Sequence, residues 1–380
     1  MNCQNNNYRV IVDLNAIVHN VKNIEKSYNV KVMGVIKANA YGHGAVPVAR
    51  AFIKAGVSYL GIAKPSDAVA IRRAGVNKSV GILSWLISPN TNLKDLIDND
   101  IDISVGSFFT LDRIVSIANG CDKSVRIQVK LEVQSGRDGF CLGDEGELKS
   151  RLRSVRAMKN VRVTGVWGHF SMADNPKHNA NRELGEYIGR ISRYISDIGY
   201  RRVLRHACNS TGLLTLPQYH FDMVRPASFC FGLSSDDNSL RPSDLGLRPS
   251  MTIVAKIAGV HTVHAGDGIG YGHEWVANKT TKIGVIYFGY ADGMPHINSG
   301  RVKVFSRKTN RYCDVVGSIC MDQIFVDLGA NSVLDIGDEI EVFGKEPCLI
   351  GDLAMSASTM HANILANLRE DILIEYKYCA

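Results

Sequence analysis

Val35-Ile36-Lys37-Ala38-Asn39-Ala40-Tyr41-Gly42-His43-Gly44 joins the end of an apolar run, which begins at Val30, to a Gly-rich turn. The run brings a single lysine, Lys37, to the point where strand character ends, and Tyr41 follows one turn later. In a barrel of parallel strands this is where a reactive amine would be placed. A solvated lysine beside ordinary turn glycines gives the same pattern. The rest of the chain must decide between these interpretations.

From this stretch onward, short apolar segments alternate with helical ones. The predicted strands are 31–36, 59–63, 80–85, 101–105, 125–133, 161–169, 203–208 and 223–225. The predicted helices between them are 45–55, 65–74, 93–99, 108–118, 145–158 and 181–198. Eight such units predict an α/β fold with a closed, TIM-like (β/α)8 barrel of parallel strands, and a doubly wound open sheet is the alternative.

The sequence changes character after the barrel. Residues 234–249 are rich in Ser, Asp, Arg and Pro and predict a linker. Beyond them, alternating runs separated by Gly and Asp turns predict a mainly antiparallel β domain with one helix at 352–367. Its predicted strands are 252–263, 281–287, 301–305, 312–316, 324–328 and 339–343. We expect a barrel over 1–235 and a β domain over 236–380, with the first strand, about residues 8–14, able to pack with the second domain.

Composition and charge restrict the possible functions. The chain is 45% hydrophobic and 21% charged, as in folded soluble proteins. It shows neither a secretory signal nor an apolar run of the roughly 18 residues that a membrane span needs, so we expect a cytoplasmic protein. Nine scattered cysteines predict reduced thiols and no metal site. The net charge is +7, but its two basic clusters, 151–156 and 201–205, follow or end predicted helices and predict solvated faces, not a nucleic-acid surface.

Polar and ionisable residues recur where the predicted strands end, whereas we expect apolar strand interiors. The loops at the C-terminal ends of barrel strands converge on the axis. The residues concerned are Lys37, Glu132, Arg137, His169, Asn209, Ser210, Arg225 and Ser228. Taken singly, Asn209 and Ser210 also fit a helix N-cap, His169 a core histidine, and Arg137 an ion pair with Asp138.

The loops after the seventh and eighth strands are the usual phosphate position in barrels. Asn-Ser-Thr-Gly at 209–212 and Arg-Pro-Ala-Ser at 225–228 supply hydroxyls and backbone N–H groups there. A lysine amine facing a phosphate across the barrel mouth describes a site for pyridoxal 5′-phosphate, whose aldehyde such a lysine holds as a Schiff base.

Seven segments, in the same order and with matching spacing, resemble the alanine racemases, a family of barrel-type pyridoxal phosphate-dependent enzymes. The resemblance covers nearly the whole chain. The segments are Val-Ile-Lys-Ala-Asn-Ala-Tyr-Gly-His-Gly at 35–44, Gly-His-Phe-Ser-Met-Ala-Asp at 168–174, His-Ala-Cys-Asn-Ser at 206–210, Met-Val-Arg-Pro at 223–226, Gly-Tyr-Gly at 270–272, Gly-Tyr-Ala-Asp-Gly at 289–293 and Cys-Met-Asp-Gln at 320–323.

The resemblance implies two catalytic bases. Lys37 would carry the cofactor and act on the D face of the substrate, and Tyr271, from the second subunit of a homodimer, would act on the L face. Arg225 would donate to the pyridine nitrogen and keep it unprotonated, because arginine has no acceptor and retains its charge. The cofactor is then a weaker electron sink, which favours simple reprotonation. His169, together with Arg225, would tune the two bases Lys37 and Tyr271.

The resemblance also implies the remaining contacts. Tyr41, Asn209, Ser210 and the backbone at Ala227 and Ser228 would bind the phosphate side of the cofactor. Arg137 would contact its phenolic oxygen and the substrate, and Met321 would bind the substrate carboxylate through its backbone. Lys130 aligns with a lysine that is carbamylated in many family members, an anion that could orient Arg137; an unmodified strand lysine is the alternative.

Some positions depart from the family pattern. The usual Lys-x-Asp-Thr-Gly-Met-Gly-Arg reads Lys-Leu-Glu-Val-Gln-Ser-Gly-Arg over 130–137. Ala362 stands where the family has a phosphate-binding tyrosine, so one hydrogen bond to the phosphate should be missing or made by His361 or Asn363 instead. His296 and Ser318 replace arginines near the substrate entrance. These differences alter the mouth of the pocket and leave the substrate open.

The expected activity is the interconversion of L- and D-alanine by a two-base mechanism, which supplies D-alanine for the peptidoglycan of the cell wall. A racemase of serine or another small amino acid is a close variant. A non-catalytic pyridoxal phosphate-binding protein is a different class, but such a single-barrel carrier would need neither Tyr271 nor Met321. A barrel decarboxylase would pair the pyridine nitrogen with an acid, so Arg225 argues against it.

Overall fold

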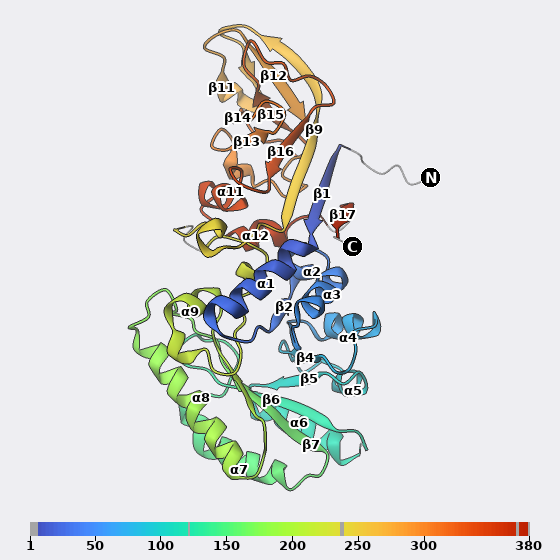
Figure 1. The fold of residues 1–380 in the computed structure, drawn as a ribbon, viewed down its shortest axis with the longest axis vertical. Helices are drawn as coiled ribbons and strands as arrows, with labels where there is room; N and C mark the ends of the chain where they lie inside the picture. The colour runs from blue at the N-terminus through green and yellow to red at the C-terminus, as the bar shows by residue number, and fades with distance from the viewer. Residues whose placement is uncertain (1–6, 121, 236–238, 370–371, 379–380) are drawn as a thin grey trace. The chain divides into compact units, whose positions relative to one another are not determined.

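The computed structural model describes residues 7–120, 122–235, 239–369 and 372–378 (Figure 1). These residues form two compact units. The barrel unit comprises the described residues of 21–40 and 45–230, and the β unit comprises those of 1–20, 41–44 and 231–380. Residues 236–238 of the predicted linker lie outside the described residues.

Seven parallel strands form the sheet of the barrel unit in their sequence order. They are β2 (Gly34–Ile36), β3 (Tyr59–Ile62), β4 (Gly81–Ser84), β5 (Asp102–Val105), β6 (Val125–Lys130), β7 (Val161–Trp167) and β8 (Leu204–His206). Met223 and Val224 occupy the eighth position, with parallel bridges to His206 on one side and Val32 on the other. Val224 accepts from the N–H of Met33 at 2.9 Å, which closes the ring. The predicted barrel is therefore confirmed, although its eighth strand is only a bridge.

Helices connect these strands. The barrel unit contains α2 (Ala38–Tyr41, whose last residue belongs to the β unit), α3 (Ala45–Ala55), α4 (Pro65–Arg73), α5 (Leu93–Asp98), α6 (Phe108–Asn119), α7 (Glu145–Arg156), α8 (Asn179–Asp197), α9 (Ser210–Thr215), α10 (Ala227–Cys230), η1 (Leu142–Asp144) and η2 (Pro217–Tyr219). The six predicted helices connect the strands as α3 to α8, whereas the short elements α2, α9, α10, η1 and η2 were not predicted. The helix α8 buries Leu184, Ile188, Ile191 and Ile195 on one face, the spacing that a helix packed on a sheet requires. The helix α1 (Leu14–Tyr28) precedes the barrel strands, and its first turn is capped by Asp13.

An eight-stranded, mainly antiparallel sheet forms the β unit, in the order β12-β15-β14-β13-β16-β9-β1-β17. The strand β9 also pairs with β12, so six of these strands close on themselves, and the only parallel pair among the described strands of this sheet is β1 with β17. The strands are β1 (Tyr8–Asp13), β9 (Met251–Val263), β12 (Thr281–Ile286), β13 (Lys303–Ser306), β14 (Arg311–Val316), β15 (Ile324–Asp327), β16 (Glu339–Phe343) and β17 (Ile374–Lys377).

Short elements account for most differences from the prediction. The single helix expected at 352–367 is wrong, because α11 (Ile350–Ser356) and α12 (His361–Ala366) are separate. Ser358 between them has a φ of 50°, a left-handed conformation that a continuous right-handed helix excludes. Sequence periodicity did not predict β17 or the two-residue strands. The remaining elements are β10 (Gly268–Ile269), β11 (Trp275–Val276), η3 (Pro242–Leu245), η4 (Tyr271–His273) and η5 (His296–Asn298).

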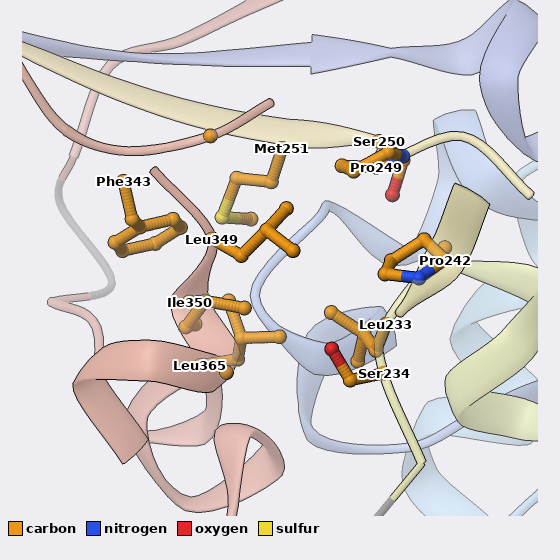
Figure 2. Close-up of a pocket in the computed structure, with 13 residues that line it drawn as sticks. Leu233, Ser234, Pro242, Pro249, Ser250, Met251, Phe343, Leu349, Ile350 and Leu365 are labelled. Carbon is orange, nitrogen blue, oxygen red and sulfur yellow. The ribbon is translucent and has the colours of Figure 1, made fainter. Parts of the chain in front are cut away.

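The core of the β unit contains a small apolar cavity (Figure 2). Apolar side chains from β9, β16, α11, α12 and the segment before β9 line most of it, including Leu233, Met251, Phe343, Leu349 and Leu365. None of the described residues that line it has a titratable side chain, so it is a packing feature and not a site. Among the described residues, no helix has both the length and the apolar character needed to cross a bilayer.

Candidate active site

Lys37 directly follows β2 and is exposed. The turn after it is left-handed, with φ values of 48°, 51°, 57° and 54° at Ala38, Asn39, Ala40 and Tyr41. Each such L-residue costs about 1–2 kcal/mol, and strain of this kind concentrates at functional sites. Asn39 partly compensates, because its Oδ1 accepts from the N–H of Ala45 at 2.8 Å at the start of α3. The predicted turn therefore begins with four non-glycine residues.

His169, which follows β7, lies within the electrostatic reach of four predicted site cations. Its pKa lies well below the ordinary value, first because burial disfavours the imidazolium and then because Arg225, Arg137, Lys37 and Lys130 carry like charge. These five residues end or follow three different strands, β2, β6 and β7, and the bridge at Val224. The structure thus brings together, at one end of the barrel unit, residues far apart in the sequence, and their summed positive charge favours an anionic ligand.

Arg225 is buried among acceptors. Its Nη2 donates to the carbonyl oxygens of Gly168 at 2.7 Å and Ala207 at 3.1 Å, and its Nη1 donates to Nδ1 of His206 at 2.6 Å. Its guanidinium carbon lies 5.0 Å from the centroid of the Trp167 ring. Burial lowers the pKa of Arg225 to about 10, so the side chain remains a cation near neutral pH. Any ligand atom that pairs with it must be an acceptor.

The two predicted phosphate loops begin short helices. Asn209 is the N-cap of α9, and its Oδ1 accepts from the N–H of Gly212 at 2.8 Å. The N-cap interpretation is therefore correct for this oxygen, while its Nδ2 lies 3.5 Å from Nε2 of His169. Ser210 is the first residue of α9, and Ala227 and Ser228 begin α10. The N–H of Ala227 already donates to the carbonyl of Arg225 at 2.9 Å, as that of Gly212 does to Asn209. First-turn N–H groups have no partner within their own helix, so the other N–H groups of both loops can donate to an anion.

Lys130 and Glu132 have contacts that the sequence did not predict. Lys130 is buried, with its Nζ 3.5 Å from Oδ2 of Asp138, and burial is the main cause of its lowered pKa. The predicted ion pair of Asp138 is thus made with Lys130. The Glu132 carboxylate accepts from the N–H groups of Ser135 and, at 3.0 Å, Gly136. This departure from the family pattern therefore fixes the turn that leads to the exposed Arg137.

In the β unit, Tyr271 and Met321 line the same open cleft, of about 450 Å³. Tyr271 is 76% exposed and Met321 55%. The motif at 289–293 supports this cleft, because the N–H of Ala291 donates to the carbonyl of Met321 at 2.9 Å. A Cβ added to Gly289 would lie 2.2 Å from the same carbonyl oxygen, so only glycine permits this approach. Three predicted motifs of the β unit thus pack together, with Gly317 placed against Ile269 beside them.

The departures near the substrate entrance are neighbours. Nε2 of His296 lies 3.3 Å from Oγ of Ser318, and the ring of Tyr290 packs on His296 with centroids 5.9 Å apart. The two replaced arginine positions therefore form one hydrogen-bonded pair.

Two other positions were predicted on the phosphate side of the cofactor. Ala362 lies on α12. Tyr41 is buried in the β unit, where its ring packs against that of Phe231 with centroids 5.2 Å apart.

Sequence reasoning assigned no role to His206, Trp167 or Gln128. His206 stacks on Trp167 with ring centroids 5.8 Å apart and an angle of 12°, directly behind Arg225. The expectation of apolar strand interiors is wrong at Gln128 and Asp102, which are fully buried on β6 and β5. A polar residue inside an otherwise apolar strand is unusual when buried. That signal was present in the sequence and could have identified them.

Comparisons with known proteins identify the family of both parts of the chain. The chain matches the alanine racemase N-terminal domain family over residues 12–235 and the alanine racemase C-terminal domain family over residues 250–376. It is 36% identical over 374 residues to an alanine racemase of Mycolicibacterium smegmatis, covering 97% of this chain and 94% of that protein.

Two solved structures are similar over almost the full length. The alanine racemase from D-cycloserine producing Streptomyces lavendulae has a TM-score of 0.92 and 36% identity, with 98% of each chain covered. The alanine racemase from Streptomyces coelicolor A3(2) has a TM-score of 0.91 and 33% identity, covering 97% of this chain and 98% of that one. The chain therefore belongs to the alanine racemase family.

Proposed function

We propose that this protein is a pyridoxal phosphate-dependent racemase that interconverts L- and D-alanine. The observation that supports this most directly is the group of Lys37, Lys130, Arg137 and Arg225 around His169. A primary amine and several cations at the ends of barrel strands suit a cofactor that has an aldehyde and a dianionic phosphate. The D-alanine produced would serve peptidoglycan synthesis.

The donor set in the barrel unit fits pyridoxal phosphate. Lys37 is exposed at the end of β2 and offers the amine, while Ser210, Ser228 and the N–H groups around Ala227 offer donors for the phosphate. When bound, the cofactor supplies an electron-accepting ring that makes the Cα–H bond of an attached amino acid more acidic. Tyr41 and Asn209 are further proposed contacts on the phosphate side.

Arg225 would control how strongly that ring accepts electrons. Its hydrogen bonds to Gly168, Ala207 and His206 hold the guanidinium in place. Because it can only donate, a pyridine nitrogen facing it must accept and stay unprotonated. His169 beside it has a depressed pKa and is neutral near pH 7, so it adds no further charge. This arrangement favours returning a proton to Cα over other outcomes.

Two side chains would move the proton. The amine of Lys37 takes it from, or returns it to, one face of Cα, and the hydroxyl of Tyr271 does so on the opposite face. Arg137 and the backbone N–H of Met321 would bind the substrate carboxylate, because a carboxylate needs donors. The carbonyl of Met321 accepts from the N–H of Ala291. Whether Lys130 is carbamylated stays a prediction, although its contact with Asp138 suits the unmodified cation.

We infer that the enzyme is a homodimer with shared active sites. Tyr271 and Met321 are 76% and 55% exposed at the same open cleft, and neighbouring exposed apolar side chains of this kind mark an interaction site. A second copy that brings Tyr271 and Met321 to the barrel unit would complete each site.

An assay with chiral detection tests the proposal. The purified enzyme, loaded with pyridoxal phosphate, is incubated separately with L-alanine, L-serine and a panel of other small L-amino acids. We expect D-alanine to form fastest. Serine belongs in the panel because the His296–Ser318 pair changes the predicted entrance. Cofactor binding without racemisation of any member would support the non-catalytic carrier instead.

A further inference from the structure

Buried hydrogen bonds lead from Arg225 into the interior of the barrel unit. The Nη1 of Arg225 donates to Nδ1 of His206 at 2.6 Å, and Nε2 of His206 lies 2.8 Å from Oε1 of Gln128. The Nε2 of Gln128 donates to Oδ2 of Asp102 at 3.2 Å and to the hydroxyl of Tyr59 at 3.0 Å. His206, Gln128 and Asp102 all have 0% exposure. The path therefore crosses β8, β6 and β5 within the core.

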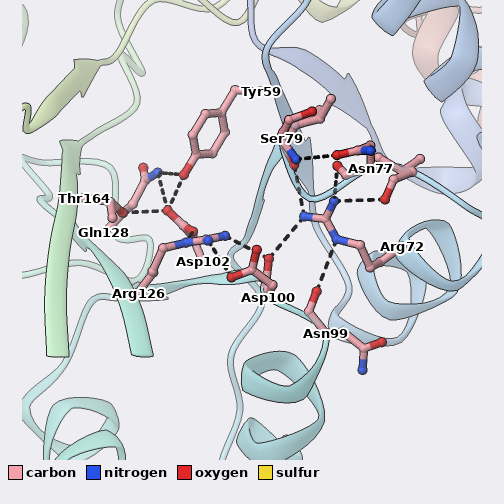
Figure 3. A network of polar contacts seen from close by, with 12 residues as sticks. Tyr59, Arg72, Asn77, Ser79, Asn99, Asp100, Asp102, Arg126, Gln128 and Thr164 are labelled. Carbon is pink, nitrogen blue, oxygen red and sulfur yellow. Dashed lines mark hydrogen bonds and ion pairs between the residues drawn. The ribbon is translucent and has the colours of Figure 1, made fainter. Parts of the chain in front are cut away.

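The inner end of this path is an anchored carboxylate (Figure 3). Asp102 accepts from Nε of Arg126 at 2.5 Å, from Oγ1 of Thr164 at 2.6 Å and from the hydroxyl of Tyr59. Arg126 is held in turn by Asp100, with Nη1 and Oδ1 2.5 Å apart. A buried carboxylate fixed by a half-buried arginine is a strong and permanent acceptor.

Donor and acceptor chemistry gives these hydrogen bonds one direction. Arginine has only donors, so Nδ1 of His206 must accept. A carboxylate has only acceptors, so Gln128 must turn its NH2 group to Asp102 and its oxygen to His206. Nε2 of His206 must then donate. Both ends demand the same arrangement, with the single imidazole proton on Nε2.

We propose that Gln128 and Asp102 are positioning residues for Arg225. The carboxylate of Asp102 orients the amide of Gln128, the amide holds the His206 proton on Nε2, and the free lone pair on Nδ1 keeps the Arg225 guanidinium in place. Burial and the charge of Arg225 also hold the pKa of His206 well below its ordinary value, so the ring stays neutral. The placement of the proton stands on these contacts alone, whereas its effect on turnover rests on the proposed racemase function.

Asp102→Asn tests the direction of the hydrogen bonds with almost no change in volume. Arg126 donates to one side of residue 102, so the introduced amide must turn its oxygen there and its NH2 group toward Gln128. Gln128 then has to flip and present its own NH2 group to His206. We expect the His206 proton to move toward Nδ1, where it conflicts with the donor Nη1 of Arg225. The matched control is Thr164→Val, which removes a donor from Asp102 but leaves the carboxylate.

The measurement is ¹⁵N NMR of histidine-labelled protein without cofactor, with the His206 signals assigned by their loss in His206→Gln. Wild type and Thr164→Val should show only the Nε2–H form, and Asp102→Asn should populate the Nδ1–H form. A His206 that stays entirely Nε2–H in Asp102→Asn overturns the proposal, as does a proton shift in Thr164→Val. This readout is independent of catalysis, so it remains decisive even if the protein proves not to be a racemase.

Kinetics of the loaded enzyme provide the second test and cover the case in which Asp102→Asn does not fold. Gln128→Met removes the hydrogen bonds that join His206 to Asp102. We expect kcat to fall about 10-fold with KM unchanged, which is the lower end of the range found when a residue that orients a site ligand is lost. Where Asp102→Asn folds, adding it to Gln128→Met should cause no further loss, because Asp102 acts through Gln128. Wild-type kcat in Gln128→Met, or losses that multiply in the double variant, would contradict the proposal.

Discussion

Arg225 places a cation in the interior of the barrel unit, where its acceptors are two carbonyl oxygens and a ring nitrogen of His206. A buried charge is tolerated only when hydrogen bonds compensate for the lost hydration. Both histidines beside it, His169 and His206, have pKa values well below the ordinary value because of burial and because Arg225 opposes a second charge. At the scale of the residue, the site therefore offers a fixed donor to an acceptor ligand and keeps both neighbouring imidazoles neutral.

These histidines make stability depend on pH. Below their ordinary pKa of about 6.5 the unfolded chain binds protons that the folded chain does not, so the unfolding free energy should fall as the pH falls. Each histidine can contribute up to about 1.4 kcal/mol per pH unit until its folded pKa is reached. Urea unfolding of the cofactor-free protein between pH 7.5 and 5 should therefore show a shallower slope for His169→Gln than for wild type. His261→Gln, at an exposed position on β9, is the control, and identical slopes in His169→Gln and wild type would contradict the prediction.

Tyr271→Phe tests the second base. Overall racemisation rates cannot separate the two faces, since the equilibrium constant between enantiomers is one and fixes the ratio of kcat/KM values. Exchange of the Cα proton in D2O does separate them. We expect exchange from L-alanine to fall by 10²–10⁴-fold, the usual contribution of a general base, while D-alanine still exchanges through Lys37. Equal losses for both enantiomers would be incompatible with one base on each face.

The left-handed turn after β2 is the element that sets Lys37 apart from an ordinary strand-end lysine. Four consecutive non-glycine residues have positive φ, and Asn39 at its centre caps α3 through Ala45. Asn is among the few residues that tolerate this conformation. The turn and the helix therefore stabilise each other at the base of the site.

Asn39→Ala should lower the unfolding free energy by about 1 kcal/mol, because the N–H of Ala45 loses its side-chain acceptor. Asn39→Asp keeps an acceptor of the same shape and should stay close to wild type. Chemical denaturation of the two cofactor-free variants makes the comparison. An alanine variant as stable as the aspartate variant would show that the cap contributes nothing.

Local periodicity was sufficient to predict the longer elements of the barrel, and the strand-end rule identified Lys37, Arg137 and Arg225, which the structure gathers around His169. Lys130 was identified by the family resemblance alone. Contacts that link distant strands leave no local pattern in the sequence. The path from His206 through Gln128 to Asp102 joins three strands. The sequence of any one of these strands does not indicate which side chains of the other two it contacts. The left-handed turn was missed for a different reason: Ala-Asn-Ala carries no glycine to mark it. The strand β17 is a short segment whose partner, β1, lies at the other end of the chain.

At the scale of the whole molecule, the proposed site residues are divided between two units with separate sheets. The barrel unit carries Lys37 and Arg225, and the β unit carries the exposed Tyr271 and Met321. If each site combines the barrel unit of one subunit with the β unit of another, a Lys37 defect on one subunit and a Tyr271 defect on the other fall in the same site of a mixed dimer. The second site then keeps both residues.

Co-expression of Lys37→Ala and Tyr271→Phe chains with different affinity tags tests this division most directly. Each variant alone should be nearly inactive. In a mixed dimer, one site receives both defects and the other receives neither, so random pairing should restore about a quarter of the wild-type racemase activity. Purification through both tags should enrich that activity to about half. Doubly tagged dimers that remain as inactive as the single variants would contradict a site shared between subunits.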